Sequence, residues 1–272
     1  MHAKTMKNGR NLLCIALIVA SGLCAAEPPP GFLRKIAERE TANARARENY
    51  TFRQSVSVQE IDIHGVMTGE YGEVRDITFS PAVGRFEKVI TPGHSTLTRV
   101  RLTKEDFNDI RNIEPFLLTN ETVALYEGRY EGEQTMDGFQ CFIEHVRPKQ
   151  ILSGQRFFEG TLWVRESDFA VVRAEGQAVP QIDNLKEQNL TPHFTTIRRQ
   201  IDGKWFFPVE TYSDDTLFFR DFPQRLMTHV RYSNYKKFEA ESTITFGDSE
   251  AATPDNKPPE LKPPANLMPR PE

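Results

Sequence analysis

The sequence predicts a mainly β protein of the α+β class, in which a curled antiparallel sheet of about ten strands is covered by two or three helices. Three observations support this prediction. Many segments alternate apolar and polar residues, Asp-Gly pairs at 137–138 and 202–203 are typical hairpin turns, and two other stretches have helical spacing. A long sheet with one apolar face tends to curl, and helices on its concave side complete the burial.

The chain begins with the features of a secretory signal peptide. Three basic residues precede the apolar run 12–20, and small residues follow up to Ala26. The run is too short for a membrane span, so we expect residues 1–26 to be cleaved off and the mature protein to be periplasmic. Cys24 lacks the Leu and the Gly or Ala that a lipobox places before its cysteine, so lipoprotein anchoring there is not expected.

Cysteine content and charge limit the function classes. After cleavage Cys141 is the one remaining cysteine, so no intrachain disulfide can form and the core alone must hold the fold. The full chain has a net charge of -4, and loss of the basic leader makes the exported part more acidic. Because no basic patch stands out, nucleic acid is not an expected partner.

The first elements are a helix and a strand. Residues 31–49 form an amphipathic pattern with a short apolar stripe, which predicts a helix lying across a sheet. Residues 50–60 alternate strictly and predict a half-buried strand. Further strands are predicted over 71–79 and 85–90, after a turn at 64–65.

Residues 103–118 return to helical spacing. Thr103 and Asp106 match a capping box, and apolar residues recur at intervals of three and four. Pro115 is expected to split this helix or to begin a second short one.

The central feature is a hairpin over residues 157–178, with its turn at 166–168. Leu162 and Val164 share the apolar parity of its first arm, and Val172 shares that of the second. Trp163 falls on the polar parity and needs separate cover. Other strands are predicted over 139–145, 195–201, 205–212, 216–222, 226–235 and 238–246.

The composition changes beyond Gly247. Residues 248–272 are rich in Pro and charged residues and have almost nothing apolar. Such a segment cannot bury enough surface to offset its ordering entropy, so we expect a disordered tail with polyproline character. Residues 27–247 then form one domain.

Several segments follow one another along the chain in a characteristic order: the helix leading into NYTF at 49–52, CFIE at 141–144 with RPK at 147–149, EGTLWV at 159–164 with FAVVR at 169–173, GKWFFP at 203–208, and the closing strand at 235–246. In this order they resemble the lipoprotein-sorting-like periplasmic proteins, the LolA/LolB-like superfamily that includes the ligand-sensing domain of RseB/MucB-type regulators. The resemblance implies an unclosed half-barrel with helices as a lid over an apolar cavity for lipid or the acyl chains of lipoproteins. The Pro-rich tail departs from the family pattern.

Residues suited to catalysis do not converge in the sequence. The five histidines outside the leader show neither an HExxH motif nor helical ligand spacing. Residues 93–95 superficially suggest a nucleophile elbow, but Leu97 replaces its second glycine. Cys141 lies on an apolar strand parity, which is typical of a small buried hydrophobe. We expect no catalytic residue, no bound metal and no cofactor.

The predicted function is non-enzymatic binding of an acyl chain, a lipid or a lipoprotein in the half-barrel. The same apolar face is equally explained by core packing against the helices. One alternative is a cell-envelope sensor or scaffold that recognises a protein partner through the same shell and the C-terminal tail, and an envelope hydrolase is a minor one. The predicted cavity-lining residues are Ile143, Leu162, Val164, Val172 and Phe207.

Overall fold

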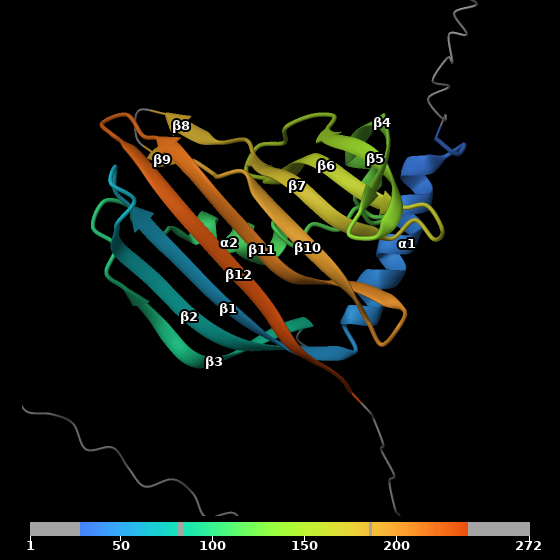
Figure 1. Ribbon diagram of the computed structural model, residues 1–272, viewed down its shortest axis with the longest axis horizontal. Coiled ribbons are helices and arrows are strands. Elements are labelled where there is room, and N and C mark those ends of the chain that lie inside the picture. The colour runs from blue at the N-terminus through green and yellow to red at the C-terminus, as the bar shows by residue number, and fades with distance from the viewer. Residues whose placement is uncertain (1–27, 81–83, 185–186, 239–272) are drawn as a thin grey trace, which may run out of the picture. The chain divides into compact units, whose positions relative to one another are not determined.

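One antiparallel sheet of ten strands dominates the part of the chain that the computed structural model describes, which is residues 28–80, 84–184 and 187–238. Its strand order is β3-β2-β1-β12-β11-β10-β7-β6-β5-β4, so β3 and β4 are unpaired edges and the sheet is not closed (Figure 1). The predicted fold class is therefore confirmed. The strands are β1 (Tyr50–Ile61), β2 (Met67–Ser80), β3 (Gly84–Ser95), β4 (Tyr126–Met136), β5 (Phe139–Pro148), β6 (Phe157–Arg165), β7 (Val171–Val179), β10 (Phe194–Ile201), β11 (Trp205–Phe218) and β12 (Pro223–Lys237).

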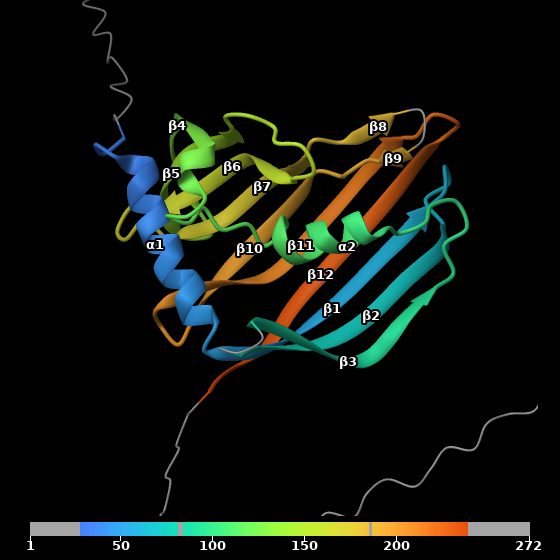
Figure 2. The same cartoon turned by 180° about the vertical axis from the view of Figure 1, so that it is seen from behind.

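Two helices lie on the same face of this sheet (Figure 2), which we call the helix-covered face. They are α1 (Phe32–Arg47) and α2 (Lys104–Asn112), and a short 3-10 helix, η1 (Val123–Leu125), precedes β4. A separate two-stranded ribbon is formed by β8 (Ile182–Asn184) and β9 (Glu187–Asn189). Among the described residues, no helix is long and apolar enough to cross a membrane.

Helix α1 presents one stripe of residues to the sheet. Its buried positions include Phe32 and Ile36 near the start and Glu40 and Asn43 farther on. The Asn43 amide donates to the Phe206 carbonyl oxygen at 2.8 Å and accepts from the Phe206 amide at 3.2 Å. The stripe is therefore apolar at its beginning and polar at its end, and the polar end attaches the helix to β11.

Helix α2 begins with the predicted capping box. The Thr103 hydroxyl accepts from the Asp106 amide, and the Asp106 carboxylate accepts from the Thr103 amide at 2.6 Å. The helix ends at Asn112, earlier than its apolar spacing suggested. Pro115 explains the early end, because it disfavours helical geometry in Glu114 before it and has no amide of its own to donate.

Both predicted two-residue turns are confirmed. Asp137 and Gly138 have φ values of 52° and 85°, and Asp202 and Gly203 have 48° and 65°. Two successive positive φ angles match the twist of antiparallel strands, and Asp-Gly tolerates them well. These turns set the β4-β5 and β10-β11 hairpins.

The C-terminal strand boundaries differ from the prediction. The polar run 213–215 does not end a strand, because β11 continues through it to Phe218 and pairs with β12 from Glu210 to Phe218. An ion pair between Asp214 and Arg225, at 2.6 Å, links the two strands within this run. The predicted strand at 238–246, apart from Phe238, lies outside the described residues, as do the leader and the Pro-rich tail.

The buried apolar residues form three clusters. The first lies between α1 and the strands β4 to β7 and includes Phe32, Ile36 and Phe158. The second gathers residues of β1, β2, β12 and α2, among them Ile110 and Val230. The third surrounds Trp163, whose ring is covered by Arg173 at 5.8 Å, so the cover that Trp163 needs is present.

Candidate functional site

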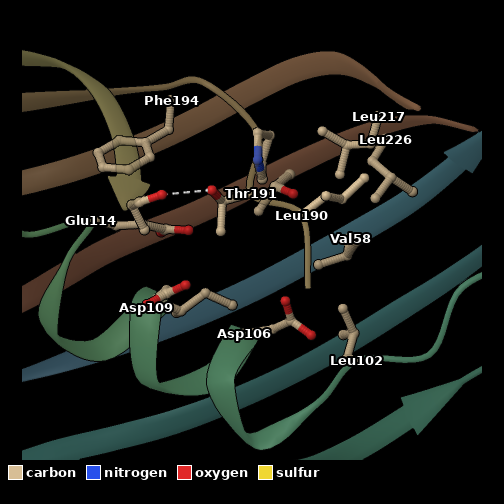
Figure 3. Close-up of a pocket in the computed structure, with 14 residues that line it drawn as sticks. Val58, Leu102, Asp106, Asp109, Glu114, Leu190, Thr191, Phe194, Leu217 and Leu226 are labelled. Carbon is tan, nitrogen blue, oxygen red and sulfur yellow. Dashed lines mark hydrogen bonds between the residues drawn. The ribbon is translucent and has the colours of Figure 1, made fainter. Parts of the chain in front are cut away.

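The helix-covered face is hollowed beside α2, and we call this hollow the α2 pocket. It has a volume of about 60 Å³. Figure 3 shows Asp106 and Asp109 of α2 on one side and strand residues on the other. The apolar part of the lining comes from segments far apart in the sequence and includes Val58, Leu102, Ile110, Phe194, Leu217 and Leu226.

Two of the three acidic residues of the α2 pocket already have partners. The Asp106 carboxylate caps α2 and accepts from the Asn189 amide at 2.8 Å. The Asp109 carboxylate is paired with the Arg156 guanidinium at 2.5 Å, and both side chains are nearly buried. Burial raises the pKa of Asp109, while the hydrogen bond and charge of Arg156 lower it.

Glu114 is the third acidic residue, and its carboxyl group has no partner among the described residues. Burial, together with the nearby charge of Asp109, raises the pKa of Glu114 to about 8. The carboxyl group is therefore mostly protonated at neutral pH and is a hydrogen-bond donor. The backbone beside it is fixed, because the Thr196 hydroxyl donates to the Glu114 carbonyl oxygen at 2.7 Å. The α2 pocket thus offers apolar walls with one neutral donor.

A second hollow is lined by Arg47 at the end of α1 and by residues of the segment 113–117, and we call it the Arg47 groove. Its volume is about 290 Å³. Its wall is formed by apolar residues of the α2–β4 connection and by three arginines. The lining residues used below are Arg47, Arg111, Phe116, Leu117, Leu125 and Arg156.

The volume of each hollow limits the size of the ligand that it can hold. Sites for small molecules usually enclose about 300 to 1,000 Å³. The α2 pocket, at about 60 Å³, accommodates a few water-sized groups, such as the end of an apolar chain. The Arg47 groove, at about 290 Å³, is close to the lower end of the usual range.

The predicted cavity-lining residues of the central hairpin lie in different clusters. Leu162 and Val164 are fully buried in the first cluster, under α1. Val172 is buried in the third cluster with Trp163, and Ile143 packs against the same cluster. Strand alternation predicted that Val172 and Leu162 lie on the same face of the sheet, and the structure shows that this prediction is wrong.

A β-bulge is the physical reason for this correction. Trp163 pairs with Arg173, but Val164 pairs with Val171, so Val172 is the extra residue between two paired ones. A bulge places two neighbouring side chains on one side of a strand and shifts the alternation beyond it. Val172 and Arg173 therefore do not point to opposite faces of the sheet.

Phe207, the remaining predicted residue, is buried among aromatic rings. Its ring centroid lies 5.1 Å from that of Tyr50 and 5.3 Å from that of Tyr235. None of the five predicted residues lines the α2 pocket or the Arg47 groove. Their contact with a ligand stays a prediction.

Other residues considered for chemistry are dispersed. Cys141 is fully buried, and burial raises the pKa of its thiol to about 11, which disfavours the thiolate. His94 and Ser95 end the edge strand β3. Within residues 28–80, 84–184 and 187–238, no group of three or more His, Cys, Asp or Glu side chains has the arrangement of a metal site.

The sequence interpretation missed the charged residues of the helix-covered face. Arg198 and Glu40 are fully buried and paired at 2.5 Å. Strand parity gives one signal, since Arg198 alternates with the buried Phe194 and Thr196. For Glu114, which is followed by Pro115, the sequence has no signal of burial.

Comparison with known proteins finds similarity to solved structures alone, because no family model and no curated protein matches the chain. A DUF1329 family protein from Desulfovibrio piger has a TM-score of 0.38 and 14% identity, covering 82% of this chain and 99% of that one. A LolA superfamily protein, NE2245 from Nitrosomonas europaea, has a TM-score of 0.34 and 14% identity, with the same coverage.

A third similar structure is a putative outer membrane lipoprotein-sorting protein domain from Vibrio parahaemolyticus. Its TM-score is 0.33 at 10% identity, covering 72% of this chain and 91% of that chain. Because these TM-scores and identities are low, no function is transferred from these proteins. The chain is thus similar in structure to LolA superfamily and lipoprotein-sorting proteins, the group that its sequence resembles.

Proposed function

We propose that this chain is an exported, non-enzymatic binding protein that holds an apolar chain, from a lipid or a lipidated protein, on the helix-covered face. The supporting observation is the α2 pocket, where Val58, Leu217 and Leu226 face α2 without filling the space between them (Figure 3). Each methylene group removed from water contributes about 0.8 kcal/mol to binding. The pocket takes the end of the chain, and the rest lies along the face.

The neutral carboxyl group of Glu114 fits this role. A charged group in the α2 pocket would have to be desolvated whenever a chain entered, at a cost of several kcal/mol. A protonated Glu114 avoids that cost and donates to a carbonyl or hydroxyl oxygen of the ligand. The proposed ligand therefore has an apolar end with an oxygen acceptor nearby.

The test uses a neutral apolar fluorescent probe, N-phenyl-1-naphthylamine, and the purified mature chain. Leu226→Trp fills the α2 pocket and is expected to weaken probe binding by about tenfold or more, because several apolar contacts are lost. Met227→Trp is the matched control. Met227 is the next residue on β12, is 38% exposed and does not line the α2 pocket, so its variant should bind as wild type does.

The outcomes separate binding from folding. Circular dichroism and thermal unfolding establish that both variants are folded. A folded Leu226→Trp that binds the probe as tightly as wild type contradicts the proposed site, and a wild-type chain without probe binding contradicts the proposed function. Extraction of the purified protein followed by mass spectrometry then identifies any lipid that it retains.

A second candidate function, a cell-envelope scaffold or sensor, is favoured by the exposed edge strand β3. Phe86 and Val89 are 55% and 50% exposed, and within the described residues one edge of β3 is unpaired, so a partner strand can pair with it. A partner protein that binds this edge would be released by Val89→Lys. The same substitution should leave probe binding at the α2 pocket unchanged.

A further inference from the structure

Arg47 is a cation on the helix-covered face with no acidic partner among the residues that the structure describes. It continues the stripe of α1 that faces the sheet, since Ile36, Glu40, Asn43 and Arg47 follow at intervals of four, three and four. Glu40 pairs with Arg198, and Asn43 bonds to the backbone of Phe206. In the described residues, Arg47 alone of these polar side chains has neither a hydrogen bond nor an ion pair.

The end of α1 does not need Arg47. The Glu48 and Asn49 amides donate to the carbonyl oxygens of Ala44 and Ala46, and the Asn49 side chain donates to that of Arg45. Arg45, exposed in the same last turn, supplies a positive charge near the helix C-terminus. An arginine turned toward the sheet is therefore not explained by helix capping.

The surroundings of Arg47 make its position costly. Burial lowers the pKa of its guanidinium, and the like charges of Arg198 and Arg85 lower it further, although Tyr235 acts in the opposite direction. Arg47 is partly buried, and withdrawing a cation even in part from water without a partner is unfavourable. A charge kept in such a place is typical of a binding site whose ligand supplies the missing partner.

The Arg47 groove has the charge pattern of an anion site. Its lining contains Arg47, Arg111 and Arg156 and no Asp or Glu. Arg111 is paired with Glu87 at 3.2 Å and Arg156 with Asp109, so one guanidinium charge remains uncompensated. This local excess is opposite in sign to the net charge of the chain, -4.

The apolar wall of the groove completes the pattern. Phe116 is buried, Leu117 is partly buried and Leu125 is 38% exposed, and all three line the groove with Arg47. Guanidinium groups bind phosphate and carboxylate through paired N–H donors. A ligand that binds both the guanidinium groups and the apolar wall has a negatively charged group joined to an apolar chain.

We propose that the Arg47 groove recognises the anionic headgroup, phosphate or carboxylate, of an amphiphile whose chain contacts Phe116, Leu117 and Leu125. This inference rests on the proposed function and narrows its ligand to acidic amphiphiles. Arg47 is the recognising residue, and its N–H groups donate to the headgroup oxygens.

The experiment compares two lysolipids with the same lauroyl chain, lysophosphatidic acid and lysophosphatidylcholine, by isothermal titration calorimetry with the full mature chain. Wild type should bind the anionic lysolipid about tenfold more tightly or better, the gain expected for hydrogen bonds between charged groups. Arg47→Gln should remove this preference and leave the zwitterionic lysolipid unaffected. Arg47→Lys should retain part of it, and Arg45→Gln, on the same helix turn, should retain all of it.

Thermal unfolding without ligand is the second readout. Because Arg47 is partly buried and unpaired in the described part of the chain, Arg47→Gln should raise the Tm, whereas a structural arginine would lower it when replaced. A lowered Tm, an unfolded variant or an equal loss of both lysolipids assigns Arg47 a structural role and overturns the proposal.

The remaining outcomes separate this inference from the proposed function. If wild type binds both lysolipids equally, headgroup recognition fails and chain binding stands. If it binds neither lysolipid nor the neutral probe, both fail. The third arm of the experiment uses inorganic phosphate alone. If phosphate raises the Tm of wild type as much as the anionic lysolipid does, and does not raise the Tm of Arg47→Gln, the groove is an anion site for free phosphate. That result overturns the lipid assignment.

Discussion

Individual buried charges determine how the helix-covered face behaves. Glu40, Glu114 and Arg198 are nearly or fully buried, but they differ in their partners. Glu40 and Arg198 neutralise each other, and Arg198 also donates to the Phe116 carbonyl oxygen. Glu114 has no charged partner and is instead neutral at physiological pH. Each arrangement leads to a different prediction.

Replacing Glu114 by Gln should change the pH dependence of stability. The folded pKa of about 8 lies above the usual value of 4.5, so the folded state holds a proton that the unfolded state releases between these values. The contribution of Glu114 to stability is therefore fully present below pH 4.5 and falls as pH rises to about 8, by about 1.4 kcal/mol for each pKa unit. Thermal unfolding from pH 4 to 9 should show this fall in wild type and a flatter curve in Glu114→Gln.

The control for this prediction is Glu121→Gln, an exposed position in the same connection. It should follow the wild-type curve. A Glu114→Gln curve parallel to that of wild type would mean that Glu114 is ionised in the folded protein.

Breaking the buried pair should be costly. Arg198→Met leaves Glu40 buried without its partner and is expected to destabilise the fold by about 3 to 5 kcal/mol. The double variant Glu40→Leu/Arg198→Met should cost much less than the sum of the single changes. Urea unfolding of the four proteins gives the interaction energy, and additive costs would show that the two charges are not coupled.

At the scale of elements, α2 depends on how it begins. Its Thr103 hydroxyl accepts from the Asp106 amide and from the Asn189 side chain, which ties the helix to β9. The α2 pocket lies directly beneath this helix. Any loosening of α2 should therefore affect both stability and ligand binding.

Thr103→Ala should lower the stability of the fold by about 1 kcal/mol, the usual cost of losing an N-cap side chain. Thr103→Ser keeps the hydroxyl and should remain close to wild type. Urea unfolding measures the stabilities, and the neutral probe reports whether the α2 pocket changes with them. Equal stabilities of the Ala and Ser variants would show that the cap contributes nothing.

At the scale of the whole molecule, one compact unit ending at Phe238 contains the sheet, both helices and both hollows. The order of the sheet places β12 beside β1, so the first and last described strands pair with each other in the interior of the sheet.

Deletion of residues 248–272 should leave the Tm nearly unchanged. The deleted sequence contains only Leu261, Leu267 and Met268 as large apolar residues, too few to add much buried surface. Differential scanning calorimetry of the two mature chains measures the effect. A fall of many degrees would show that the tail packs on the folded unit.

The sequence by itself determined most of the elements and their order along the chain, although not all of their ends. Alternation with a period of two, the two Asp-Gly turns and the Thr103–Asp106 capping box depend on neighbours within a few residues, so they are readable from the chain alone. The resemblance extended this to an unclosed sheet with helices on one face. These local signals also predicted that Trp163 needs cover.

Only the tertiary structure decided which residues surround the hollows. The α2 pocket and the Arg47 groove are built from segments distant in sequence, and no local pattern encodes which segments meet. One bulge at Val172 was enough to invalidate a parity argument, because alternation propagates a single register shift to every later residue. Whether Arg47, Glu114 and Arg198 are paired, neutral or unpartnered depends on long-range packing, which sets their desolvation and their partners.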